Sequence, residues 1–148
     1  MEPLEQSALA LKAMLDRKQI SAVEVMQATL ARIDAVNGSV NSVVSLRDHD
    51  ALIAEAAQAD ATPRRGPLHG LPMAIKDLAD AKGLPTSMGS PIYAGQVATS
   101  DALMVARLRA AGAIIIGKTN TPEFGLGSHT FNPVHGVPRK PYTLWPCA

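Results

Sequence analysis

The chain centres on the stretch Gly66-Pro-Leu-His-Gly-Leu-Pro-Met-Ala-Ile-Lys-Asp77, in which turn residues precede a short apolar run. Residues 71–75 are apolar and contain one proline. A short apolar run with glycine and proline before it predicts a buried strand. Lys76 stands where that strand should end, and the rest of the chain is best understood from this position.

Lys76 has two interpretations. Alternation along a strand places it on the same face as Ala74, with Met73 and Ile75 on the other face. The small side chain of Ala74 leaves room beside the amine, and an amine drawn toward an apolar interior loses hydration. Its neutral form, which a general base needs, is then favoured. The simpler alternative is a strand-end lysine whose amine reaches water.

Length and composition favour one domain and exclude several classes of protein. A chain of 148 residues suits a single domain. The net charge of +1 argues against binding to nucleic acid or to a membrane surface. The single cysteine, Cys147, cannot form an internal disulfide. The acidic N-terminus does not resemble a signal peptide, and no apolar run approaches the roughly 18 residues of a membrane span. We therefore expect a cytoplasmic protein.

Two amphipathic helices are predicted at the start of the chain. Apolar residues recur at helical spacing over residues 3–18. A second helix over residues 21–36 opens with a capping box formed by Ser21 and Glu24. The Asn-Gly pair that begins at Asn37 is expected to stop this helix.

The following elements alternate between strand and helix. We predict a short strand over residues 43–46 and an alanine-rich helix over residues 48–61. After the Lys76 strand, residues 78–99 read as a long irregular loop, which in a compact domain is usually functional or disordered. A helix over residues 100–111 and a β-branched strand over residues 113–116 complete a strand–helix–strand unit. Such a unit predicts parallel pairing of its two strands.

The chain is thus expected to form one partial domain in three parts. Residues 1–62 make a helical part, and residues 66–119 make the strand–loop–helix–strand block that carries Lys76. Residues 120–148 form an irregular tail without periodicity.

Two motifs suggest phosphate binding but lack the required context. Gly112-Ala-Ile-Ile-Ile-Gly-Lys-Thr119 matches the P-loop pattern, yet a P-loop has its strand before the first glycine and a helix after the motif. Here the intervening residues themselves predict a strand, and Pro122 follows soon after. Met73-Ala-Ile-Lys76 imitates a kinase strand, but the other kinase motifs are absent from the sequence. We expect no nucleotide site.

The remaining polar residues carry weaker signals. The histidines lack the spacing and partners of a metal site, so neither a metal nor another cofactor is expected; they are His49, His69, His129 and His135. Ser128 precedes His129 directly, and neighbouring side chains on an extended backbone point apart, so a polar loop is favoured over a nucleophile pair. Asp77 could orient the Lys76 amine or face solvent.

Several blocks of the chain, in order, resemble the amidase signature family. The likeness runs from about residue 20 to residue 143 without a large gap. The blocks are Gly66 to Asp77, Asp101 to Leu108, Ala111-Gly-Ala-Ile-Ile-Ile-Gly-Lys-Thr-Asn-Thr-Pro-Glu-Phe124 and Asn132-Pro-Val-His-Gly136.

The resemblance implies the N-terminal portion of the amidase-signature fold, a mixed β-sheet flanked by helices that is incomplete in this chain. The family uses a Ser–cis-Ser–Lys triad to hydrolyse carboxamides through an acyl-serine, and Lys76 falls on its lysine. There the lysine acts through the bridging serine to take the proton of the nucleophile. By the same resemblance Gly125, Leu126 and Gly127 line the pocket for the acyl group.

The C-terminal residues depart from the family. The sequence ends with Lys140-Pro-Tyr-Thr-Leu-Trp-Pro-Cys-Ala148, where the family continues into a Gly-Gly-Ser-Ser-Gly-Gly segment that carries the bridging serine. The chain therefore resembles the first third of an amidase, truncated or shifted out of frame near Thr143. We expect it to be inactive alone and prone to self-association, because strands that would pair with later strands have open edges.

Two other functions are compatible with the sequence. The glutaminase-like component of a tRNA-dependent amidotransferase has the same triad, although Glu123-Phe-Gly-Leu-Gly-Ser-His129 looks more like general bacterial amidases. A non-catalytic remnant or binding module that keeps the edge of the fold is the third possibility.

Overall fold

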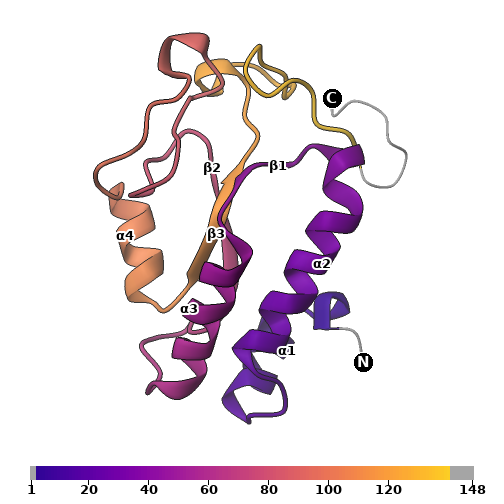
Figure 1. The fold of residues 1–148 in the computed structure, drawn as a ribbon, viewed down its shortest axis with the longest axis vertical. Coiled ribbons are helices and arrows are strands. Elements are labelled where there is room, and N and C mark those ends of the chain that lie inside the picture. The colour runs from indigo at the N-terminus through magenta and orange to yellow at the C-terminus, as the bar shows by residue number, and fades with distance from the viewer. Residues whose placement is uncertain (1–2, 141–148) are drawn as a thin grey trace.

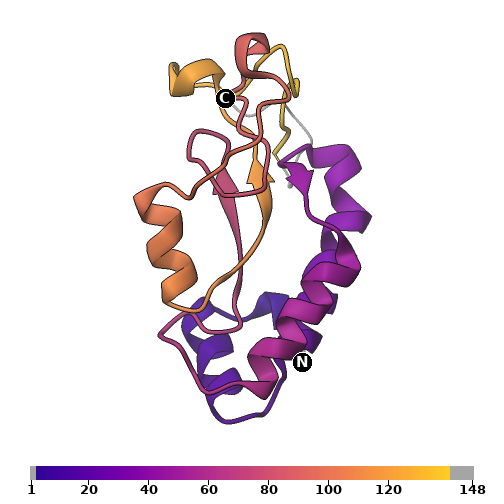
Figure 2. The same ribbon diagram turned by 60° about the vertical axis from the view of Figure 1, so that its left-hand side comes forward.

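A computed structural model describes residues 3–140, which form a small mixed sheet between two helical layers (Figures 1 and 2). In chain order the elements are η1 (Pro3–Glu5), α1 (Ala8–Asp16), α2 (Ala22–Val40), β1 (Val43–Leu46), α3 (His49–Ala61), β2 (Pro72–Lys76), η2 (Pro91–Tyr93), α4 (Leu103–Ala110), β3 (Ile114–Thr119) and η3 (Glu123–Gly125). The predicted α/β class is confirmed. Cys147 and the last part of the predicted tail, residues 141–148, lie outside the described residues.

The sheet has the strand order β1-β3-β2. β2 and β3 are parallel, as the strand–helix–strand pattern predicts, and β1 pairs antiparallel with β3. β3 is longer than predicted and continues through Gly117 and Lys118 to Thr119, because its backbone pairs with a neighbour on each side. The apparent P-loop motif is therefore part of a central strand.

The two faces of β2 contact different helices, as the alternation of its side chains predicts. Ala74 packs against a core cluster formed by α2, α3 and β3. Met73 and Ile75 belong to a second cluster on the opposite face, which includes Val105 of α4. Figure 2 shows α4 on one side of the sheet and the N-terminal helices on the other. Each face of the sheet is thus covered by its own helices.

The helix boundaries differ from the prediction at several ends. α1 begins only at Ala8, after the N-cap Ser7, and Pro3 lies in a separate 3-10 turn. α2 continues through Asn37 and ends at Asn41, whose φ of 54° is left-handed. Asn37 does not stop the helix because its side chain instead bonds the backbone of residues 42 and 43, which fixes the start of β1.

The helix starts illustrate two different roles for acidic residues. The predicted capping box is present in α2, and its hydrogen bonds from Ser21 lower the pKa of Glu24. α4 begins at Leu103 rather than at residue 100. Asp101 does not cap it, because its carboxylate accepts a hydrogen bond from the Lys82 amide at 2.7 Å and pairs with Arg109. Asp101 therefore ties the long loop to α4.

Within residues 3–140, none of the helices is both long enough and apolar enough to cross a membrane.

Gly117 provides a direct test of the strand arrangement. A Cβ atom at this position would overlap the carbonyl oxygen of Ser45 in β1, so Gly117→Ala should destabilise the fold by about 1–3 kcal/mol. Gly38→Ala adds the same methyl group to α2, where nothing lies within 4 Å, and should stabilise by up to about 1 kcal/mol. Urea unfolding of the two variants measures the difference. Equal stability of the two variants would contradict the pairing of β1 with β3.

Candidate functional site

Lys76 is the last residue of β2, at the end of the sheet where both parallel strands finish. The loops that follow β2 and β3 gather at this same end (Figure 1). The Lys76 carbonyl accepts hydrogen bonds from the amides of Leu78 at 2.7 Å and Ala79 at 3.1 Å, and the Asp77 amide donates to Thr119 at 3.0 Å. The backbone around Lys76 is therefore held on both sides.

The Lys76 side chain is exposed rather than drawn into the interior. Lys76 ends an outer strand of the sheet, and no described residue hydrogen-bonds to its amine. Of the two interpretations of Lys76, the strand-end lysine whose amine reaches water is the one that describes residues 3–140. Its position at the strand end is as predicted.

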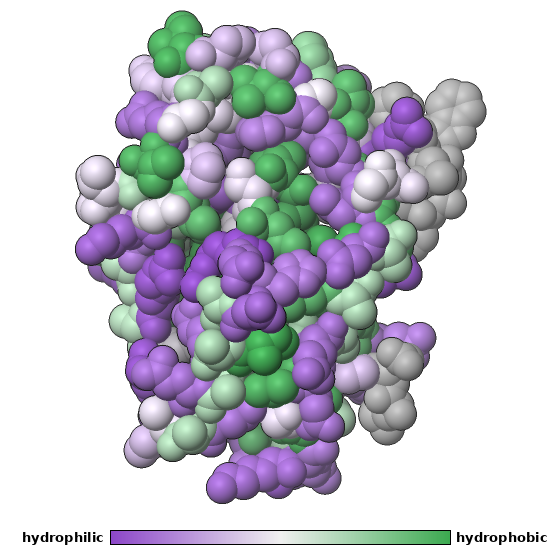
Figure 3. All heavy atoms as spheres, viewed as in Figure 1, coloured by the Kyte–Doolittle hydropathy of each residue, from purple (hydrophilic) through white to green (hydrophobic). Residues whose placement is uncertain are grey.

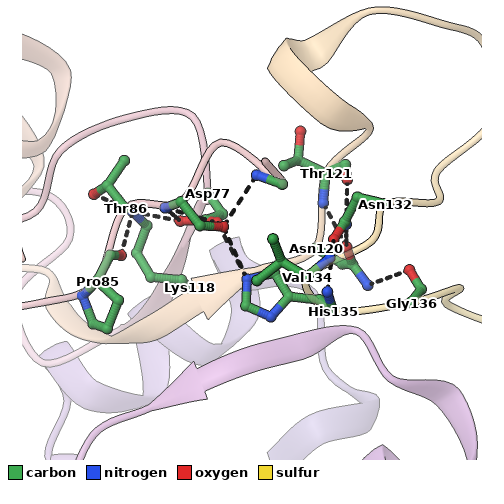
Figure 4. Close-up of polar contacts among 12 residues, drawn as sticks. Asp77, Pro85, Thr86, Lys118, Asn120, Thr121, Asn132, Val134, His135 and Gly136 are labelled. Carbon is green, nitrogen blue, oxygen red and sulfur yellow. Dashed lines mark hydrogen bonds and ion pairs between the residues drawn. The ribbon is translucent and has the colours of Figure 1, made fainter. Parts of the chain in front are cut away.

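The buried lysine is Lys118, which the sequence does not single out as buried. Its side chain has no exposed area, and its amine donates to the Ala79 carbonyl at 2.9 Å, the Pro85 carbonyl at 3.1 Å and the Thr86 hydroxyl at 2.9 Å (Figure 4). The amine also lies 3.2 Å from a carboxylate oxygen of Asp77. Burial lowers the pKa of Lys118, and the nearby Asp77 charge opposes this effect.

The Asp77 carboxylate does not bond the Lys76 amine, and it does not face solvent. It is 1% exposed and points inward to Lys118. Its carboxylate also accepts hydrogen bonds from Ser87, through the amide at 3.2 Å and the hydroxyl at 2.5 Å, and lies 3.4 Å from Nε2 of His135. Asp77 follows the last residue of β2, and in the turn that begins there it is buried while Lys76 is exposed.

Ser87, His135 and Asp77 resemble a hydrolase triad in composition but not in geometry. In a Ser-His-Asp triad the carboxylate binds one ring nitrogen and the serine binds the other. Here the Ser87 hydroxyl lies 3.1 Å from Nε2 of His135, the same nitrogen that faces Asp77. The Ser87 hydroxyl donates to Asp77 and is 3% exposed. This cluster is a structural hydrogen-bond network, not a nucleophile site.

Two asparagines attach the C-terminal segment to the rest of the molecule, one to the residues that follow β3 and the other to the end of α2. The Asn132 side chain donates to Asn120 at 2.7 Å and to the Thr121 carbonyl at 2.8 Å, and it accepts from the His135 amide at 2.7 Å. The Asn41 side chain donates to the His135 carbonyl at 2.7 Å. Sequence reasoning missed this network, and the only signal for it was the Asn-Pro turn within the block at residues 132–136.

The loop predicted to line an acyl pocket lies next to the segment that follows Lys76. Gly125 has a left-handed φ of 73°, and a Cβ atom there would lie 2.8 Å from a methyl carbon of Leu78. Leu126 and Gly127 line a cavity of about 430 Å³. Its other lining residues are Glu123, Phe124, Ser128, His129, Phe131, Asn132 and Pro133. Lys76 is not among the described residues that line it.

Two loops at this end of the molecule are joined through strained backbone. Met88 and Phe124 are non-glycine residues with left-handed φ values of 53° and 52°. The Phe124 amide donates to the Met88 carbonyl at 2.8 Å. Such conformations cost free energy and persist only where their surroundings fix them.

Figure 3 shows apolar groups interspersed with polar ones at this end, where the exposed side chains include Ile92, Phe124, Leu126 and Phe131.

Ser128 and His129 do not point apart as predicted. The Ser128 hydroxyl lies 2.8 Å from Nδ1 of His129, and both side chains are exposed. The prediction assumed an extended backbone, but the loop bends after Gly127, whose φ is 113°. No described carboxylate hydrogen-bonds to His129, so this pair lacks the orienting partner of a nucleophile site.

Among the described side chains, no three histidine, cysteine, aspartate or glutamate residues gather as a metal-binding group.

The fold and the order of the motifs define the class of protein. Residues 24–145 match the sequence profile of the family described as Amidase. The chain belongs to the amidase family, and the resemblance to the amidase-signature enzymes is confirmed.

Individual relatives share this N-terminal part. The chain is 40% identical over 142 residues to an acylamidase of Rhodococcus erythropolis, covering 93% of this chain and 30% of that protein. It is 39% identical over 145 residues to a glutamyl-tRNA(Gln) amidotransferase subunit of Acidothermus cellulolyticus, covering 95% of this chain and 28% of the relative. Among solved structures, the peptide amidase of Stenotrophomonas maltophilia superposes with a TM-score of 0.83 at 33% identity, covering 95% and 31% of the two chains. The chain thus spans less than a third of these relatives.

The structure also bears on the apparent P-loop. Lys118 is buried and already bonded, and Gly117 lies in β3, where it pairs with β1 and β2, so neither group is free to receive a phosphate. We predict no binding of ATP or GTP in calorimetry at micromolar to millimolar nucleotide. Micromolar affinity that is lost in Lys118→Ala would contradict the strand assignment.

Proposed function

We propose that this chain supplies the general base of a carboxamide hydrolase that works through an acyl-serine intermediate, with Lys76 as the base. The observation that carries the proposal is the position of Lys76. Its backbone is held by β3 and by the turn that follows, while its side chain is exposed and its amine bonds no described residue at the end of the sheet where the loops converge. A base must be fixed in place and still reach the proton that it accepts.

The proposed reaction needs two serines besides Lys76. The uncharged amine accepts a proton from a bridging serine, which in turn accepts the proton of the nucleophilic serine as that oxygen attacks the amide carbon. In residues 3–140 no serine hydroxyl hydrogen-bonds to the Lys76 amine. The proposal therefore places both serines outside these residues.

The acyl part of the substrate is proposed to occupy the cavity beside Gly125, Leu126 and Gly127. Phe124 and Phe131 add apolar surface to this cavity, which favours an aliphatic or aromatic acyl group. The contact between Gly125 and Leu78 supports a position close to the segment that carries Lys76.

A chimera tests the role of Lys76. Residues 24–140 of this chain would replace the matching residues of the Rhodococcus acylamidase, and turnover of simple aliphatic and aromatic amides would be measured. Lys76→Ala should lower kcat/KM by about 10²–10⁴-fold, the usual contribution of a general base. Lys76→Arg should be equally impaired, because an arginine stays protonated.

The matched control is Lys82→Ala, which removes another exposed lysine six positions further along the same segment. It should leave turnover within about twofold of the unmodified chimera. The purified 148-residue chain alone should show background rates, because a base without a nucleophile forms no acyl-serine. A chimera whose activity survives Lys76→Ala would contradict the role of Lys76. Turnover by the chain alone that is lost in Lys76→Ala would instead contradict the placement of both serines outside residues 3–140.

A second candidate is the glutaminase part of a tRNA-dependent amidotransferase. Its support is the near-equal identity of the chain to the Acidothermus amidotransferase protein and to the Rhodococcus acylamidase, 39% and 40%. The two functions differ in substrate, since the glutaminase part releases ammonia from free glutamine. A second chimera would be built on the Acidothermus protein and assayed for glutamine hydrolysis in the complex of that protein. The relative activities of the two chimeras would show which of the two functions residues 24–140 support.

Self-association is also proposed for the isolated chain. β1 and β2 are the outer strands of the sheet, and large apolar side chains are exposed at the loop end, including Ile92 and Leu126 at 78% and 77%. Open strand edges and exposed apolar groups favour association. Light scattering during a thermal melt should show particles larger than a monomer, increasing with concentration. A sharp cooperative transition of a monomer at every concentration would contradict this prediction.

A further inference from the structure

We propose that the buried Asp77–Lys118 pair is a positioning device for Lys76, so that neither Asp77 nor Lys118 reacts but both fix where the Lys76 amine emerges. The functional importance of Lys76 rests on the function proposed above. The positioning itself rests on contacts among described residues only.

The first step is the turn that begins at Lys76. The Lys76 carbonyl accepts hydrogen bonds from the amides of Leu78 and Ala79. At the other end of this turn, the Ala79 carbonyl accepts a hydrogen bond from the Lys118 amine at 2.9 Å. The turn is thus bonded to β3 at its start, through Thr119, and at its end, through the Lys118 side chain.

The second step is the reach of the same amine across the loop. Besides Ala79, it donates to the Pro85 carbonyl and to the Thr86 hydroxyl. Residues 79 and 86 are therefore held at one point, which closes the intervening loop against the end of β3. A lysine amine has three protons, and the three hydrogen bonds to Ala79, Pro85 and Thr86 use all of them, while Asp77 adds the opposite charge (Figure 4).

The third step is Asp77, which follows Lys76 directly. Its carboxylate neutralises Lys118 and holds Ser87 through both the amide and the hydroxyl. His135 also faces the carboxylate, so the C-terminal segment lies against the same pair. The turn after Lys76, the loop at residues 85–87 and the segment of His135 are therefore all attached to one buried pair of charges.

Energetics make this arrangement sensitive to single substitutions. Removal of one member of a buried ion pair leaves an uncompensated charge in the interior, which is strongly unfavourable. The partners of the pair lie mostly in the segment that follows Lys76, so relief of that penalty should open this segment first. The loss should be concentrated in the turn after Lys76.

Hydrogen exchange measured by mass spectrometry on the full 148-residue chain at low micromolar concentration tests this proposal. In Lys118→Met and in Asp77→Asn, peptides that cover residues 77–90 should exchange at least about 10-fold faster than in the unmodified chain, whereas peptides from α2 should change little. The matched control is Asp60→Asn, since the Asp60 carboxylate also holds backbone amides, those of Ala22 and Val23, but at the start of α2. It should leave residues 77–90 unchanged.

Thr86→Val is a milder variant that keeps the test decisive if the charge substitutions unfold the chain. It removes one acceptor of Lys118 with little change in volume. Loss of a single hydrogen bond should accelerate exchange of residues 77–90 by about threefold to tenfold. Equal acceleration over the whole chain in Thr86→Val, or none in residues 77–90, would overturn the proposal.

A second readout reports on Lys76 itself. The rates at which a dilute acylating reagent modifies Lys76 and Lys18 are compared within each molecule, so that Lys18, which is exposed and lies outside residues 77–90, serves as the internal reference. The ratio should change more than about twofold in Thr86→Val and stay constant in Asp60→Asn. A constant ratio in both variants would show that the pair stabilises the loop without positioning Lys76, which overturns the proposal. No amide substrate takes part, so the result is independent of the chimera experiment.

Discussion

The buried ion pair between Lys118 and Asp77 is the interaction on which the loop end of this molecule depends. Charges taken from water are costly unless they are paired and fully hydrogen-bonded. Here the Lys118 amine has carbonyl and hydroxyl acceptors besides the carboxylate, and Asp77 has donors from Ser87. The cost is offset only while the loop after β2 stays in place, so the pair makes the conformation of that loop specific.

The sheet determines where the segments that surround the ion pair come together. β2 and β3 run parallel and finish at the same edge, so the segments that follow them must meet there (Figure 1). The close approach of β1 to β3 depends on Gly117, because any side chain there would overlap the β1 backbone. A glycine and a lysine that together imitate a phosphate-binding motif thus serve two structural purposes. The glycine admits a neighbouring strand, and the lysine closes a loop.

Much of the fold could be predicted from local pattern. Alternation in β2 correctly separated Ala74 from Met73 and Ile75, and the capping box correctly placed the start of α2. Predictions failed where a polar residue near the end of an element hydrogen-bonds a segment other than its own helix. Asn37 was expected to end α2, but its side chain bonds the start of β1, and Asp101 was expected near a helix start, but it bonds Lys82 and Arg109. A polar side chain near an element boundary can hydrogen-bond to any of several partners, and the sequence does not say which of them it bonds.

The sequence by itself determined the order of strands and helices, the parallel pairing of β2 with β3, the position of Lys76 at a strand end and the membership of the amidase family. These follow from periodicity, turn residues and the order of motifs along the chain. Only the tertiary structure decided which lysine is buried. The partners of the Lys118 amine lie 32 to 39 residues away in sequence, and His135 approaches Asp77 from a segment beyond β3. Burial of a charge is decided by the segments that converge on it, and that convergence is a property of the folded chain rather than of any local stretch.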